Sequence, residues 1–272
     1  MGKAEEQSGV KVIEETQLTE EVERKLPFIV DIFLYPLNVS GIVNMGLFLF
    51  TPLLIGVVYS LVLNGIFLVG DFFALFLFAL FFGYILYYLR LCVIGSSKGH
   101  LRAADVAYWQ WPDKSELLSQ FGMTLASIAV CFCPASLYFV LTERADIVFW
   151  FLFVPGFFFF PMCFLRVCLF DSFDSLNPVS IAGSIYTAFL PYLPLVLLFF
   201  IIALGCYFLL PPLPPAGDKL ESILLYLARF VGYLASFRFA GRMVAFFYLA
   251  MIASHLLGRF YWFNKHKLNW GL

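Results

Sequence analysis

The sequence predicts an all-α fold, namely a polytopic transmembrane bundle of about six helices accompanied by interfacial amphipathic helices. The first indication is phenylalanine: 35 of the 272 residues are Phe, and many lie in the uncharged runs 72–89 and 147–165. Runs of this length and apolarity span a bilayer and are too continuous for a soluble core. The second indication is composition, because 62% of the residues are hydrophobic and only 13% are charged. The mean hydropathy of +0.91 agrees with this prediction.

The chain divides into a polar acidic N-terminal segment, residues 1–26, and a transmembrane domain, residues 27–272. The acidic segment lacks the apolar core that a signal peptide carries near its start. The net charge of −1 gives no reason to expect a nucleic-acid partner.

An interfacial helix is expected before the first crossing, over residues 27–37, because apolar residues there recur at helical spacing. Tyr35-Pro36 ends this segment, and the stretch from Asn38 to Gly41 begins the first crossing. The six expected crossings are 42–63, 68–92, 121–141, 147–170, 186–210 and 241–261. The turn between the first two lies either at Asn64-Gly65 or at Gly70-Asp71, since both pairs favour turns.

Two connecting regions are long. Residues 93–120 are predicted as the longest polar loop, and residues 211–222 as a proline-rich connector. The run 223–241 is apolar enough to cross, but arginine inside it is costly at the bilayer centre. We interpret 221–239 as an amphipathic or re-entrant helix on the far side of the membrane.

The distribution of Lys and Arg favours cytoplasmic N- and C-termini, because positive residues accumulate in cytoplasmic loops. A seventh crossing over 221–239 would instead move Arg259, Lys265 and Lys267 outside.

Four arginines are the candidate contact residues: Arg229, Arg238, Arg242 and Arg166. Arg238 and Arg242 share one helical face, four residues apart, and lipid phosphate or an acidic residue would compensate their charge beside apolar surface. Arg166 precedes two aspartates, so an ion pair is the stronger expectation there. For Arg229, Arg238 and Arg242 the alternative is a charge that snorkels to the membrane surface or pairs with an acid. For Arg166 the alternative is a ligand site.

Catalytic, metal and cofactor sites are not expected. The crossings contain no pair of carboxylates, and no metal-ligand, P-loop or hydrolase motif is present. The six cysteines lie in or beside apolar runs without a C-x-x-C spacing, which is typical of small buried hydrophobes. His255 stands alone on an apolar face and is expected to pack between helices or to lie at the interface.

Several stretches resemble a family of bacterial and archaeal polytopic membrane proteins of unknown function. They are 83-GYILYYLRLCVIG-95, the loop with Trp109, Trp111, Pro112 and Asp113, and 121-FGMTLASIAV-130. The segments 34-LYPLNVSGIV-43, 176-LNPVSI-181 and 255-HLLGRFYWFNKHKLNW-270 look like hypothetical membrane proteins of planctomycete-type bacteria. The resemblance implies a bacterial cytoplasmic membrane and assigns no functional residues.

These features favour a non-enzymatic integral membrane protein. It would serve as an accessory or scaffolding subunit of a membrane complex, or as a membrane-organising homo-oligomer, with lipids and other membrane subunits as partners. The alternative is a small-solute or lipid transporter, because prolines within the crossings could break helices and expose backbone. A lipid-modifying enzyme is disfavoured because no acid–base pair is present.

Overall fold

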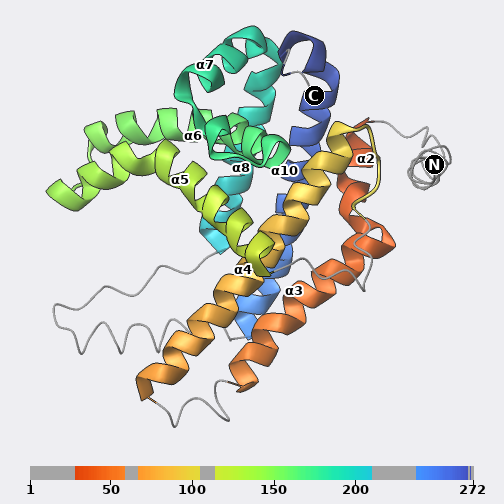
Figure 1. The fold of residues 1–272 in the computed structure, drawn as a ribbon, viewed down its shortest axis with the longest axis vertical. Coiled ribbons are helices and arrows are strands. Elements are labelled where there is room, and N and C mark those ends of the chain that lie inside the picture. Colours follow the sequence, from red (N-terminus) through yellow and green to blue (C-terminus); the bar gives the residue numbers. More distant parts are fainter. Residues whose placement is uncertain (1–27, 59–66, 105–113, 210–236, 269, 271–272) are drawn as a thin grey trace, which may run out of the picture.

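The chain is all-α, as predicted (Figure 1). A computed structural model describes residues 28–58, 67–104, 114–209, 237–268 and 270, and these contain helices and no strand. The acidic segment 1–26, the loop tryptophans Trp109 and Trp111, and residues 210–236 lie outside the described residues.

Five described helices are long and apolar enough to cross a membrane. They are α3 (Val39–Val58), α4 (Phe67–Ser97), α5 (Lys114–Thr142), α6 (Ile147–Phe170) and α10 (Phe237–Leu268). A sixth span is obtained if the bent pair α7 (Pro178–Thr187) and α8 (Phe189–Leu209) counts as one. The chain therefore has the helices of a multi-pass membrane protein.

The break between α7 and α8 divides the crossing that was expected over 186–210. The two helices are bent by 108° at Ala188. Ala188 still donates its N–H to the carbonyl of Ser184, but Pro191 has no N–H for the carbonyl of Thr187. A proline ring also clashes with the carbonyl four residues earlier, which favours a kink or break here, although α3, α5 and α6 continue past internal prolines.

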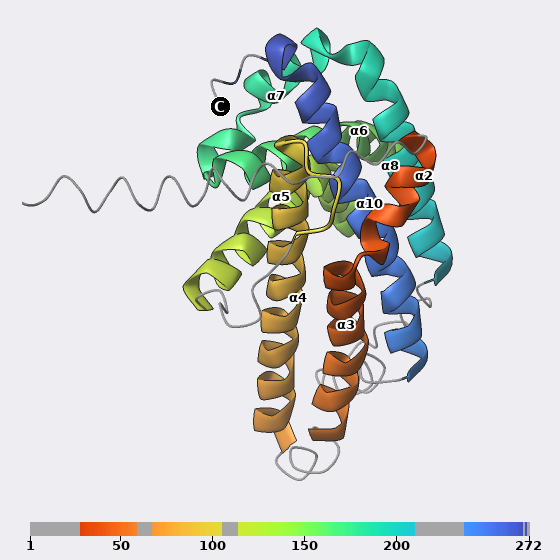
Figure 2. The same ribbon diagram turned by 90° about the vertical axis from the view of Figure 1, so that its right-hand side faces the viewer.

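The centre of the bundle is the contact between α4 and α10, which lie side by side with α3 (Figure 2). Gly258 makes this close approach possible, because a Cβ atom there would lie 2.4 Å from the carbonyl oxygen of Val93. Phe48 of α3 is fully buried, and its ring packs at a tilt of 37° against that of Phe247 of α10, with ring centroids 4.3 Å apart.

Helices α5 and α6 form a hairpin that extends away from α4 (Figure 1). Gly156 allows their backbones to meet, since a Cβ atom there would lie 2.3 Å from the carbonyl oxygen of Cys131. At the tip, Asp146 caps α6 by accepting hydrogen bonds from the N–H groups of Val148 and Phe149.

Several boundaries differ from the predicted ones. Helix α4 runs on to Ser97 and α5 begins at Lys114, so the polar loop is shorter than 93–120. Gly70-Asp71 lies inside α4 and is not a turn. The expected interfacial segment forms α2 (Phe28–Leu34) and the 3-10 helix η1 (Tyr35–Leu37), which pack against α10. Helix α10 begins at Phe237, so the last residues of 221–239 belong to it.

Candidate functional site

Polar side chains of the described helices gather at one end of the bundle, where α3 begins and α4 ends. Asn38 donates its Nδ2 to the carbonyl of Ala103 at 3.1 Å, and Ser40 donates its hydroxyl to the carbonyl of Ala104 at 2.7 Å. The side chain of Asn38 also accepts the N–H of Gly41, which caps the first turn of α3. These bonds fix the chain after α4 against the start of α3.

A buried polar contact joins α4, α10 and η1. The hydroxyl of Ser96 lies 2.7 Å from Nδ1 of His255, and the Tyr35 ring stacks on the imidazole with centroids 4.0 Å apart. The Tyr35 hydroxyl donates to the carbonyl of Cys92 at 3.4 Å. All three side chains are almost completely buried. His255 therefore packs between helices, which is one of the two roles predicted for it.

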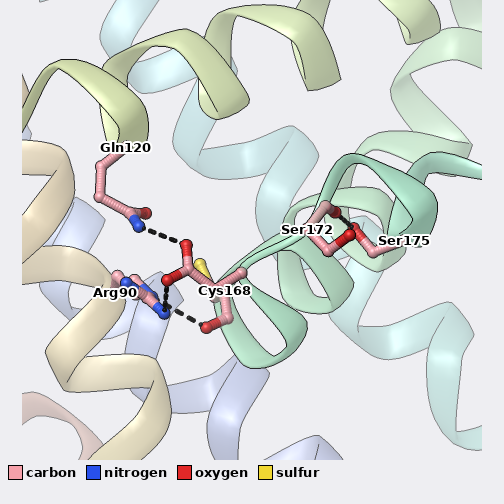
Figure 3. Close-up of polar contacts among 6 residues, drawn as sticks. Arg90, Gln120, Cys168, Ser172 and Ser175 are labelled. Atoms are coloured by element: carbon pink, nitrogen blue, oxygen red, sulfur yellow. Dashed lines mark hydrogen bonds and ion pairs between the residues drawn. The ribbon is translucent and has the colours of Figure 1, made fainter. Parts of the chain in front are cut away.

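A second polar contact joins α4, α5 and α6 (Figure 3). The carboxylate of Asp171 accepts Nη2 of Arg90 at 3.0 Å and Nε2 of Gln120 at 2.8 Å. Arg90 also donates its Nε to the carbonyl of Cys168 at 3.0 Å. Arg90 thus binds both the carbonyl of Cys168 and the carboxylate of Asp171 near the end of α6. Together with Gln120 it links α4 and α5 to that end of α6.

The backbone at Asp171 explains where the carboxylate points. Asp171 terminates α6 in the left-handed conformation with φ 51° and donates its N–H to the carbonyl of Val167. Aspartate tolerates this conformation better than most residues. The sequence predicted that Asp171 lies at a helix end. Its partner Arg90 is 81 residues earlier in the chain, and the spacing of residues along the sequence does not predict such a contact.

Arg166 does not pair with an acid of the 171–174 segment. Its guanidinium lies over the rings of Phe170 and Trp270, 5.5 and 5.3 Å from their centroids. Its Nη1 donates to the hydroxyl of Ser180 near the start of α7. The expected ion pair is replaced here by aromatic and hydroxyl contacts, because Asp171 is bound to Arg90.

Of the other three candidate arginines, only Arg242 has a described side chain. Arg242 is half-buried in the first part of α10. Arg238 belongs to the first turn of the same helix, but its side chain lies outside the described part. Arg229 lies outside the described residues altogether. Their expected phosphate or acidic contacts therefore stay predictions.

The described cysteines are free thiols in mostly buried positions. Cys92, Cys131, Cys163 and Cys168 are buried, as predicted, whereas Cys133 is exposed on α5. No group of three His, Cys, Asp or Glu side chains within the described residues could hold a metal ion.

The outward face of α5 carries a stripe of small residues that the sequence reasoning missed. Its members recur every three or four residues, and they are Gly122, Ala126, Ala129, Cys133 and Ser136. Ala129, Cys133 and Ser136 are exposed, and nothing lies within 4 Å of a Cβ atom built at Gly122. The helical repeat places this stripe opposite the buried positions Ser127, Cys131 and Ala135, so it faces away from the other described helices. The spacing was available in the sequence, but the outward direction was not.

Comparisons with known proteins add no relative: no protein family, curated protein or solved structure matches the chain. The resemblance to a bacterial and archaeal membrane family stays a prediction.

Proposed function

We propose that this chain is a non-enzymatic scaffolding protein of the membrane that assembles with copies of itself through α5. The observation that carries the proposal is the outward stripe from Gly122 to Ser136. Helices associate in bilayers through close packing rather than through hydrophobicity, and small residues allow their backbones to approach.

The burial of the spans supports the same role. In the most apolar 18-residue stretch of each span, the buried share is 56% for α10, compared with 22% for α5 and 28% for α6. Of the five described spans, those of the α5–α6 hairpin are therefore the least buried, and the hairpin projects from the other helices (Figure 1). The described polar contacts, such as Ser96 with His255, hold the helices of one chain together, and the hairpin is left for contact with lipid or with another subunit.

Molecular mass under mild detergent tests this proposal. We expect native mass spectrometry to detect an oligomer of the wild-type chain. Ala129→Trp should convert it largely to monomer, because the indole keeps a second helix at a distance. Val154→Trp is the matched control, since Val154 is also apolar and exposed but lies on α6. A monomeric wild-type chain, or an Ala129→Trp oligomer as stable as the control, would contradict the proposal.

We propose a bacterial cytoplasmic membrane with both termini on the cytoplasmic side as the location. The Lys and Arg distribution supports this orientation. Single-cysteine labelling in intact cells should then protect the exposed position 98, near Ser96, and position 265, and should modify position 145 at the hairpin tip. Labelling of position 265 from outside would reverse the orientation of α10.

A small-solute or lipid transporter is the second candidate, and the 108° bend between α7 and α8 favours it. Discontinuous helices of transporters present backbone groups to a substrate near the middle of the membrane. Cysteine accessibility distinguishes the two roles, because a transporter requires a hydrated path to Ala188, whereas the scaffold leaves this position inaccessible to water-soluble reagents.

A further inference from the structure

The guanidinium of Arg166 is a buried cation whose charge no described acid balances. Only 9% of Arg166 is exposed. The rings of Phe170 and Trp270 lie on the same side of the guanidinium, with their centroids 5.7 Å from each other, and Ser180 accepts a hydrogen bond from Nη1. The nearest acid along the chain, Asp171, already binds Arg90. A buried charge without a counter-charge is costly, so an anion at this position stabilises the fold.

Two donors on one edge of this guanidinium have no described hydrogen-bond partner. Nε is buried and has no hydrogen-bond partner, and among the described residues Nη2 donates no hydrogen bond. Nε and Nη2 form the planar fork with which arginine binds two oxygens of a phosphate or carboxylate. Since Ser180 and the two rings fix the orientation of the guanidinium, the fork is preorganised.

The depth of Arg166 in the membrane indicates the source of the anion. It lies four residues before the end of α6 at Phe170, about 6 Å along the helix axis. Trp270 stacks on Tyr261 beside it, and such aromatic rings lie at the level of lipid head groups. The last turn of α10 adds Lys265 and Lys267, whose charges attract anionic lipid.

We propose that Arg166 binds the phosphate of an anionic phospholipid through its Nε and Nη2 edge. The site consists of the Arg166 guanidinium, the Ser180 hydroxyl and the ring of Trp270. The Trp270 indole N–H donates to Ser184 at 3.0 Å, which keeps the ring over the guanidinium. This site is independent of self-association, because α5 contributes none of its residues.

Native mass spectrometry of the full chain in a mild non-ionic detergent tests the site, with phosphatidylglycerol, phosphatidylcholine and inorganic phosphate as separate probes. We expect one phosphatidylglycerol to bind the wild-type chain more tightly than phosphatidylcholine. Arg166→Gln should weaken that binding roughly tenfold. Arg144→Gln is the matched control, because Arg144 is an exposed arginine at the hairpin tip. Its affinity should equal that of the wild type.

Two further variants separate geometry from charge and from folding. Arg166→Lys keeps the charge but lacks the planar fork, so we expect it to lose most of the affinity as well. Ser180→Ala keeps the guanidinium but removes the hydrogen-bond partner of Nη1, so we expect the affinity for phosphatidylglycerol to fall several-fold. This variant tests the site even if Arg166→Gln does not fold. Ser119→Ala, at an exposed serine of α5, should leave binding unchanged.

Three results would overturn the site. They are equal binding by the wild type and Arg166→Gln, full affinity in Arg166→Lys, and inorganic phosphate that displaces the lipid at similar concentration. The last result would make free phosphate the ligand.

Discussion

Arg90 of α4 and Asp171 at the end of α6 form an ion pair 3.0 Å long, and Gln120 of α5 binds the same carboxylate. The Arg90 side chain is 12% exposed, whereas that of Asp171 is 48% exposed. Water screens an ion pair of this kind, so it contributes little to the free energy of unfolding. Its main effect is to position α4, α5 and the end of α6 relative to one another.

Asp171→Asn isolates the charge of this contact. The amide keeps an oxygen for Gln120 and tolerates the left-handed backbone, but it loses the ionic attraction to Arg90. We expect a cost of about 1 kcal/mol or less in the free energy of unfolding. Arg90→Gln should cost more, because the carbonyl of Cys168 also loses its donor. Unfolding by a denaturing detergent measures both, and equal costs would contradict the dual role of Arg90.

Gly258→Ala tests the contact of α4 with α10. The added Cβ atom would lie 2.4 Å from the carbonyl oxygen of Val93 and 2.5 Å from Cβ of Ser96, so the helices must separate. A destabilisation of about 1–3 kcal/mol is expected for such overpacking.

The matched control for Gly258 is Gly241→Ala on the same helix, where nothing lies within 4 Å of the new Cβ atom. Alanine there should be neutral or stabilise by about 0.5–1 kcal/mol, because it restricts the unfolded chain. The same thermal-unfolding measurement serves both variants. Similar effects at the two glycines would refute the close approach.

Ser96→Ala removes the hydroxyl that lies 2.7 Å from Nδ1 of His255. The buried imidazole nitrogen would then lack its partner, and this costs about 1–3 kcal/mol. Ser119→Ala on the exposed side of α5 is the control and should be neutral. If thermal unfolding gave the same temperature for both variants, the Ser96–His255 contact would not stabilise the bundle.

Acidification should loosen the tip of the α5–α6 hairpin. The Tyr138 hydroxyl and the N–H groups of Phe149 and Val148 bind the Asp146 carboxylate, and together they hold its pKa below the usual value. Because the pKa is lower in the folded state, the stabilisation is complete above about pH 4, the pKa of an unfolded aspartate, and is lost as the pH falls through the lowered value.

Hydrogen exchange at the amides of Val148 and Phe149 reports this loosening. Their protection should decrease as the pH falls below about 4, after correction for the intrinsic exchange rate. In Asp146→Asn the protection should no longer depend on pH in this range. A wild-type profile that matches the variant would show that the carboxylate does not cap α6.

The membrane-spanning helices and their approximate positions could be predicted from the sequence, because an apolar run of bilayer length is typical of such a helix. The turn alternatives illustrate the limit: Gly70-Asp71 has turn chemistry but lies inside α4, since the apolar residues on both sides favour continued helix. The break at Ala188 depends on Pro191, and a proline in an apolar run signals a break without fixing the angle.

The contacts of the candidate residues could not be predicted to the same extent. His255 was placed on an apolar face and Arg166 was expected to form an ion pair, but their partners Ser96 and Ser180 come from other helices. Periodicity reports which face of a helix is apolar, and it does not report which helix covers that face. For the same reason the outward direction of the small-residue stripe required the fold.

Cross-linking at Cys133 tests self-association through α5 most directly. Cys133 is exposed within the small-residue stripe, whereas the other described cysteines are buried. In native membranes, a short thiol-specific cross-linker should join two wild-type chains through Cys133. Cys133→Ser should abolish the dimer band, and a cysteine placed at Val154 in that background should restore little of it. Equal cross-linking from positions 133 and 154, or none from Cys133, would contradict the proposed α5 interface.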